Sequence, residues 1–184
     1  MDDGELQIIQ PTLEIDSVTA TNSWQTITLD NEYEQAVVVA SILDGNNPNS
    51  PVSVRVRDVT ATTFDIRLQF PTDNFAPSST NSETVYYLVV EAGVWTLGDG
   101  ATKIEAGIAP DISRVNCSTC GSWNNGTDLF YQQTYSAAPV VLHQVVTNND
   151  SSWITSFASD DTSATVNPGT DGFQLALNGA ESVT

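Results

Sequence analysis

The chain has 184 residues, of which 23 are acidic, four are arginine and one is lysine, so that its net charge is −18 at pH 7. This balance argues against a nucleic-acid partner, because neutralising phosphates requires basic clusters. It contains no apolar run long enough to cross a bilayer, so no membrane partner is expected either.

The acidity is spread along the whole chain, and such self-repulsion destabilises a compact protein unless salt screens it. We therefore expect a halophilic source, the alternative being an ordinary acidic surface protein. Residues 1–17 are expected to form an N-terminal arm, since their apolar content is thin. The opening MDDGELQIIQ lacks the basic-then-apolar order of a signal peptide. The chain is then cytoplasmic, cut from a precursor, or exported another way; our prediction is an extracellular or virion-surface location.

A first β-sandwich unit is predicted over residues 18–108. Valines alternate with polar residues along 52–57, and Phe64, Ile66 and Leu68 alternate with Asp65, Arg67 and Gln69. A period of two predicts antiparallel strands buried on one face. The connector 58–63 makes these two strands a hairpin. The turn Gly98-Asp99-Gly100 predicts a second hairpin, which joins 85–97 to 103–107.

Residues 109–121 are predicted to be a linker, and 122–184 a second, divergent copy of the unit. The strand 36–42 aligns with 139–145, and 63–69 aligns with 172–178. Upstream of both, Ser23-Trp24 matches Ser122-Trp123. Three such matches in the same order indicate duplication. The second copy is incomplete, because Glu181-Ser182-Val183-Thr184 aligns with the start of the strand at Glu83. We expect either that the native chain continues or that another subunit supplies the missing strand.

The first unit resembles the H-type lectin domain. The matching segments are Trp24-Gln25-Thr26, Tyr33, Val37-Val38-Val39-Ala40-Ser41-Ile42, Val54-Arg55-Val56, Asp58-Val59-Thr60-Ala61-Thr62-Thr63-Phe64 and Tyr86-Tyr87-Leu88-Val89-Val90. The resemblance implies a six-stranded antiparallel β-sandwich that forms trimers or their multiples and binds N-acetylgalactosamine-like sugars near subunit interfaces. The fold class predicted is thus all-β, one complete lectin-like unit followed by an incomplete one.

Three arginines are the first candidate ligand-binding residues. Alternation places Arg55, Arg57 and Arg67 on the outer face of one hairpin. Planar guanidinium groups suit an acidic sugar or an acidic patch on a neighbouring subunit. The alternative is local pairing with Asp58 and Asp65. The second copy carries Ser156, Ala158 and Ala176 at the aligned positions, so it would not repeat the cluster.

Asp44 and Asn46 are the other candidate ligand-binding residues, since loop carboxylates and amides can hold sugar hydroxyls. The alternative is that they only build the turn. Trp24 and its counterpart Trp123 are either sugar platforms or packed core residues, and Trp153 is expected in the core.

No catalytic, metal or cofactor site is predicted. Cys117 and Cys120 are one pair without further zinc ligands, so a short disulfide or a bridge to another chain is expected. The lone His143 lies within an apolar run, which argues against a Ser-His-Asp triad. Glu91 and Glu105 are an unsupported glycosidase pair.

The function predicted is a carbohydrate-binding adhesion module, oligomeric and part of a surface or viral appendage such as a tail fibre or spike. Its expected partners are a cell-surface glycan, further copies in a homo-oligomer, expected to be a trimer, and other virion or surface proteins. The alternative is a purely structural virion or filament protein that uses the sandwich for assembly.

Overall fold

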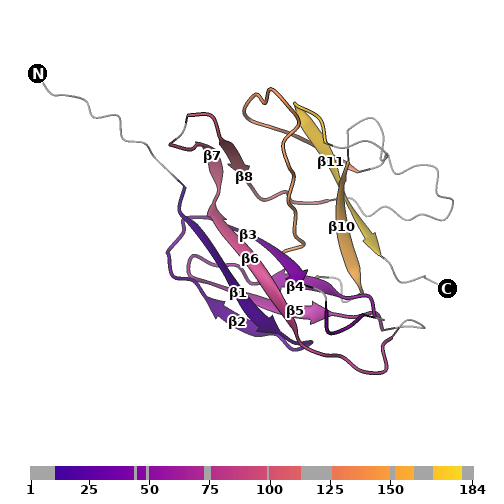
Figure 1. The fold of residues 1–184 in the computed structure, drawn as a ribbon. Helices are drawn as coiled ribbons and strands as arrows, with labels where there is room; N and C mark the ends of the chain where they lie inside the picture. Colours follow the sequence, from indigo (N-terminus) through magenta and orange to yellow (C-terminus); the bar gives the residue numbers. More distant parts are fainter. Residues whose placement is uncertain are drawn as a thin grey trace, which may run out of the picture.

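The computed structural model describes residues 11–43, 45–48, 50–72, 76–98, 100–112, 126–149, 152–159 and 168–179. Within these residues every regular element is a β-strand, and every strand pairing is antiparallel. The predicted all-β class is confirmed (Figure 1).

The first layer of the first unit is the sheet β1-β6-β3. Its central strand β6 (Glu83–Glu91) pairs along its length with β1 (Leu13–Ala20) and β3 (Ala36–Leu43). Residues 13–17 therefore belong to this sheet, although the arm was expected to reach residue 17. The low apolar content of β1 is consistent with its position at the edge of the sheet, where only a few of its side chains are buried.

The second layer is the sheet β2-β5-β4, in which β5 (Thr63–Gln69) lies between β2 (Gln25–Thr28) and β4 (Ser53–Arg57). The predicted hairpin between β4 and β5 is present. Its turn is closed by the Thr60 N–H, which donates to the Thr63 carbonyl at 2.8 Å, and Asp58 adopts a left-handed conformation with φ of 49°.

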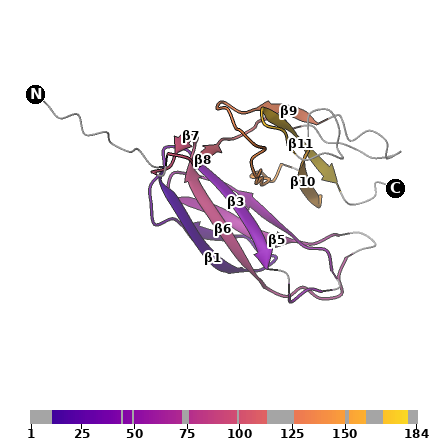
Figure 2. The same ribbon diagram turned by 45° about the horizontal axis from the view of Figure 1, so that its top comes forward.

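The core of the first unit lies between these two sheets (Figure 2). Alternate residues of β5 and β6 meet there, and the rings of Phe64 and Tyr87 pack edge to face with centroids 5.2 Å apart. The fully buried members from the two central strands are Phe64, Ile66, Val85 and Val89. The period of two in the sequence thus places apolar side chains inside the sandwich.

After β6 the chain forms the hairpin of β7 (Gly93–Thr96) and β8 (Lys103–Ala106). Ala92 separates β6 from β7, and Gly93, the first residue of β7, has a φ of 146°, a conformation that L side chains rarely adopt. The predicted single strand over 85–97 is therefore divided in two. Its hairpin partner was expected at 103–107, and β8 occupies 103–106.

The second unit contains the sheet β10-β11-β9, with β9 (Thr127–Phe130), β10 (Ile154–Ser159) and β11 (Gly172–Gly179). Its strand order along the chain and in the sheet matches that of β2-β5-β4. Hydrogen bonds of the loops also match: the Gly169 N–H donates to the Gly172 carbonyl as Thr60 does to Thr63, and Tyr131 N–H donates to the Asp171 carbonyl as Leu29 does to Thr62. These matches support the predicted duplication from geometry that the sequence alignment did not use.

The register of the second sheet corrects the sequence alignment by one residue. Phe173 corresponds to Phe64, which places Ala176 at the position of Arg67 as expected. Ala176, however, lies opposite Phe157, and Gln174 lies opposite Ser159. Phe157 and Ser159 thus correspond to Arg55 and Arg57, where Ser156 and Ala158 were expected. A shift of one residue exchanges the two faces of a strand. In β10 the apolar content alone does not determine which residues lie on which face.

The predicted strand over residues 139–145 is wrong. This segment follows β9 without forming a strand. Its counterpart β3 pairs only with β6, and no strand equivalent to β6 is present among the described residues of the second unit. A strand needs a hydrogen-bonding neighbour, so the apolar pattern of 139–145 is not sufficient.

Candidate functional site

The outer face of β2-β5-β4 gathers most polar residues that the sequence analysis singled out. Across β4 and β5, Ser53 lies opposite Gln69, Arg55 opposite Arg67, and Arg57 opposite Asp65. The alternation that buries Val54, Val56 and Ile66 inside turns all three arginines outward. The sequence therefore predicted their common face correctly.

Arg55 is nevertheless only 1 % exposed, because the second unit covers it. Its guanidinium donates to the Gln69 side-chain oxygen at 2.7 Å, to the Thr147 carbonyl at 2.7 Å and to the Ser152 carbonyl at 3.2 Å. Gln69 donates to the same Ser152 carbonyl at 3.0 Å. Arg55 is thus part of the contact between the two units and is not accessible to a ligand, which corrects the prediction made for it.

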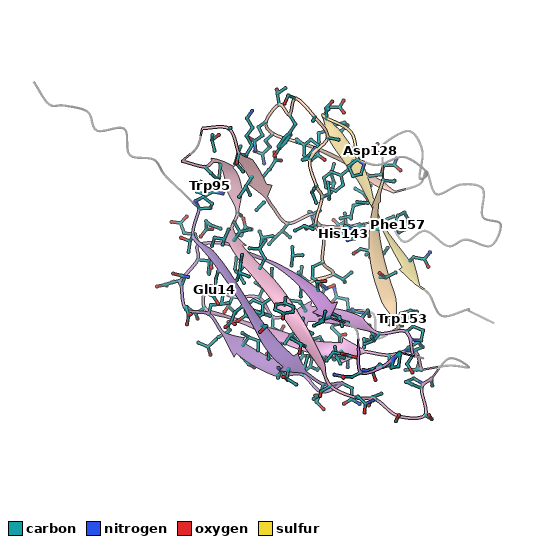
Figure 3. The ribbon with its side chains drawn as sticks, viewed as in Figure 1. Glu14, Trp95, Asp128, His143, Trp153 and Phe157 are labelled. Atoms are coloured by element: carbon teal, nitrogen blue, oxygen red, sulfur yellow. The ribbon has the colours of Figure 1, made fainter. Side chains whose placement is uncertain are left out.

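Further contacts join the units on both sides of Arg55. The Trp153 indole N–H donates to Ser53 Oγ at 2.8 Å, and the Gln144 amide donates to the Val54 carbonyl at 3.1 Å. Val146 packs against the core of the first unit. Trp153, expected in a core, is half-buried at this contact (Figure 3).

Arg57, two residues further along β4, and Arg67, opposite Arg55 on β5, lie on the same face and are partly exposed. Both guanidinium carbons lie over the Trp24 ring, at 4.2 Å and 4.6 Å from its centroid. We call these three residues the Trp24 cluster. Trp24 is half-buried, so it is neither a fully packed core residue nor an open platform. It holds two cations against an aromatic face.

The two arginines of the Trp24 cluster differ in their partners. Arg57 forms ion pairs of 3.1 Å with Asp58 and with Asp65, as the alternative reading of the sequence expected. Asp65 also accepts a hydrogen bond of 2.7 Å from the Thr26 hydroxyl. The Arg67 guanidinium forms no hydrogen bond or ion pair with any described residue, and its buried Nε has no acceptor. Burial, and then the nearby charge of Arg57, lower the pKa of Arg67.

The loop after β3 was the second predicted site. Asp44 lies outside the described residues. The Asn46 side-chain amide donates to the Ser82 carbonyl at 2.8 Å, and its backbone N–H donates to the Glu83 carboxylate at 2.9 Å. Asn47 donates to the same carboxylate at 2.6 Å. The described part of this loop is held to the first residue of β6, so Asn46 builds the turn rather than a sugar site.

Glu83 is one of four glutamates that hold loops through backbone N–H groups, a role the sequence analysis did not find. Glu14 accepts from Asp30 at 2.9 Å, Glu91 from Gln35 at 2.8 Å, and Glu105 from Gln132 at 2.9 Å. These carboxylates lie in strands beside the loops that they hold. The hydrogen bonds of Glu91 and Glu105 give both residues structural roles.

Glu14 and Glu105 also occupy equivalent places. Asp30 follows β2 by two residues and Gln132 follows β9 by two residues, and each donates to a glutamate on a strand that precedes it in the chain. By this comparison β8 corresponds to the beginning of β1. This similarity involves β8, within the segment that was predicted to close the first unit.

A cavity of about 290 Å³ lies between the units, lined by β3, β4, β10 and residues 143–145. His143 Nδ1 lies 2.8 Å from Ser156 Oγ in this cavity, and burial lowers the pKa of His143. The other lining side chains are apolar or neutral polar, so no carboxylate completes a triad among them. His143 is a hydrogen-bonded residue at the contact between units (Figure 3).

Two other kinds of site are not found in the part of the chain that the structure describes. There, no group of three or more His, Cys, Asp or Glu side chains is placed to hold a metal ion. Nor does this part contain a helix that meets the length and hydropathy of a membrane span. Cys117, Cys120 and Trp123 lie outside the described residues.

In comparisons with known proteins, the chain matches no family model, no curated protein and no solved structure. Its resemblance to the H-type lectin domain stays a prediction.

Proposed function

We propose that this chain is a non-enzymatic, carbohydrate-binding adhesion module that takes an anionic sugar at the Trp24 cluster. The observation that carries the proposal is Arg67, a half-buried cation without a hydrogen-bonding partner in the described residues. A desolvated guanidinium is stabilised by an oxyanion that accepts its N–H groups. In a chain of charge −18, an anion would be repelled by most of the surface and would bind at this position.

The geometry favours a carboxylated or sulfated sugar over a neutral one. Trp24 holds both guanidinium groups against its ring, so its face is engaged with arginine rather than open for a sugar to stack on. Arg57 is already neutralised by Asp58 and Asp65, which leaves Arg67 to bind the anion.

The setting we propose is an oligomeric surface or viral appendage of a halophilic organism or its virus. The acidic surface supports the halophilic part of this proposal, because salt screening offsets self-repulsion. A purely structural role in a virion or filament is the second candidate, and the exposed apolar segment of the second unit favours it.

The test is binding to an array of uronate-containing, sulfated and neutral glycans over a series of KCl concentrations up to molar. We expect binding to the anionic glycans, weakened by salt, and a loss of about tenfold or more in Arg67→Gln. Lys103→Gln is the matched control, since it removes one positive charge away from the cluster.

Two outcomes contradict the proposal. One is a folded wild-type protein that binds no anionic glycan at any salt concentration. The other is an equal loss of binding in Arg67→Gln and Lys103→Gln, which would indicate attraction by net charge and no site at the Trp24 cluster. Thermal unfolding of each variant establishes that it is folded.

A further inference from the structure

Among the described residues, the second unit has one layer where the first unit has two. In the first unit Phe64, Ile66 and Leu68 are at most 1 % exposed, because β1-β6-β3 covers them. Their counterparts in β11 are only half-buried: Phe173, Leu175 and Leu177. The equivalent apolar face of the second sheet is therefore incompletely covered.

The segment 139–145, which takes the place of β3, also lacks a partner. Within the described chain its backbone N–H and C=O groups form no hydrogen bond to other backbone groups. Val140 is 87 % exposed and Leu142 is 60 % exposed. An unpaired, apolar, extended segment of this kind is the template that an added β-strand uses.

The charge of this region limits what can cover it. Residues 131–149 contain no charged side chain, in a chain that carries 23 acidic residues. An acidic strand would lose hydration on this surface without gaining a cation, so the added strand must itself be uncharged. In β6 the corresponding pattern places Val85, Tyr87 and Val89 on the buried face.

We propose that residues 6–10 of a second copy of this chain, Leu6-Gln7-Ile8-Ile9-Gln10, add to 139–145 as the missing strand. Leu6 and Ile8 alternate with polar residues, and 6–12 carry no charge. Among the segments outside the described residues, this one combines apolar alternation with the absence of charge. It pairs antiparallel to 139–145, as β6 does with β3.

The topology favours donation between copies over donation within one copy. β1 starts beside the end of β6, where the Glu91 N–H donates to the Thr12 carbonyl. Figures 1 and 2 both show β1 starting on the side of β7, away from β10 and β11. The start of β1 and the acceptor segment 139–145 then lie on different sides of one molecule, and such head-to-tail contacts extend into rings or open assemblies. This assembly does not depend on glycan binding.

The test uses the full chain in molar KCl, with its mass measured by light scattering over a range of concentrations. We expect the wild type to form a concentration-dependent series of multimers. Ile8→Asp removes the donor and Val140→Asp removes the acceptor, so each variant alone is a monomer. Ile15→Asp is the matched control on β1, where Ile15 is 69 % exposed, and it assembles like the wild type.

Mixing the two monomeric variants separates this proposal from misfolding. The Ile8→Asp protein keeps an intact acceptor and the Val140→Asp protein keeps an intact donor, so the mixture forms one-to-one dimers that cannot grow. A wild type that stays monomeric at all concentrations overturns the proposal. So does a mixture of the variants that gives no dimer.

Discussion

Arg55 differs from its two neighbours on the same sheet face in what surrounds it. All three arginines project outward, but only Arg55 lies under the second unit, where two backbone carbonyls and Gln69 accept its hydrogen bonds. Hydrogen bonds from a charged group are stronger than neutral ones, and a buried acceptor without a donor is costly. Arg55 therefore connects the two halves of the chain.

We expect Arg55→Leu to lower the free energy of unfolding by on the order of 3 kcal/mol, since the Thr147 and Ser152 carbonyls lose a charged donor. Arg57→Leu is the control and should change it by about 1 kcal/mol or less, because its ion pairs are near solvent. Urea unfolding in KCl measures both. Equal losses in the two variants would contradict the role given to Arg55.

His143 makes the stability depend on pH. Burial lowers its pKa in the folded chain below the ordinary value of 6.5, so the unfolded chain binds the proton more readily. The contribution of neutral His143 is present above about pH 6.5 and is lost as the pH falls through the folded pKa. The lining side chains of its cavity carry no other titratable group.

We expect His143→Gln to lose less stability than the wild type when the pH is lowered from 7.5 towards 5. Ser156→Ala keeps the histidine and should retain the wild-type pH dependence. Chemical unfolding at each pH gives the comparison, and carboxylate titration cancels between the proteins. Parallel pH profiles of wild type and His143→Gln would disprove this assignment.

At the scale of elements, the repeated sheet shows how geometry is kept while sequence changes. Thr26 donates to Asp65 in the first unit, and Gln174 donates to Asp128 at the same two positions in the second. The donor and acceptor have exchanged strands, but a hydrogen bond joins the same positions. A cross-strand pair of this kind stabilises a register irrespective of which strand carries the acid.

Gly172 lies close to the backbone of the neighbouring strand. A Cβ there would overlap the Leu129 carbonyl oxygen of the neighbouring strand, which is backbone and cannot rotate away. We expect Gly172→Ala to destabilise the pairing of β9 and β11 by about 1–3 kcal/mol. Faster hydrogen exchange in residues 127–130 and 172–179 is the measurement.

Gly107→Ala is the matched control, since a Cβ there meets no atom within 4 Å. It should be neutral, or stabilising by up to about 1 kcal/mol through the unfolded chain. If hydrogen exchange in β9 and β11 is as slow in Gly172→Ala as in Gly107→Ala, the two strands can move apart to accommodate the methyl group. That result would contradict the expected destabilisation.

The sequence was sufficient for elements whose pattern is local. Alternation along 52–57 and 64–69 predicts β4, β5 and the facing of each side chain, and the connector predicts their turn. It was insufficient for 139–145, because a strand depends on a partner elsewhere in the chain. The sequence also could not predict the burial of Arg55, because alternation shows which face a residue takes but not what packs on that face.

At the scale of the whole molecule, the contact between units, as far as the described residues show it, is built on neutral hydrogen-bond acceptors. The five hydrogen bonds described for it run from Arg55, Gln69, Gln144 and Trp153 to backbone carbonyls or a hydroxyl. For a chain of net charge −18 this is a favourable choice, since bonds to buried neutral acceptors are little affected by the salt that the acidic surface needs.

The use of carbonyl acceptors for Arg55 also has a consequence for how the chain can vary. A carbonyl oxygen is the same in nearly every amino acid, so residues 147 and 152 can be exchanged without altering the acceptors, provided the backbone keeps its path. Arg55 has no such freedom, because no other side chain offers the same fork of donors. We therefore expect substitutions to be tolerated at positions 147 and 152 and to be selected against at Arg55.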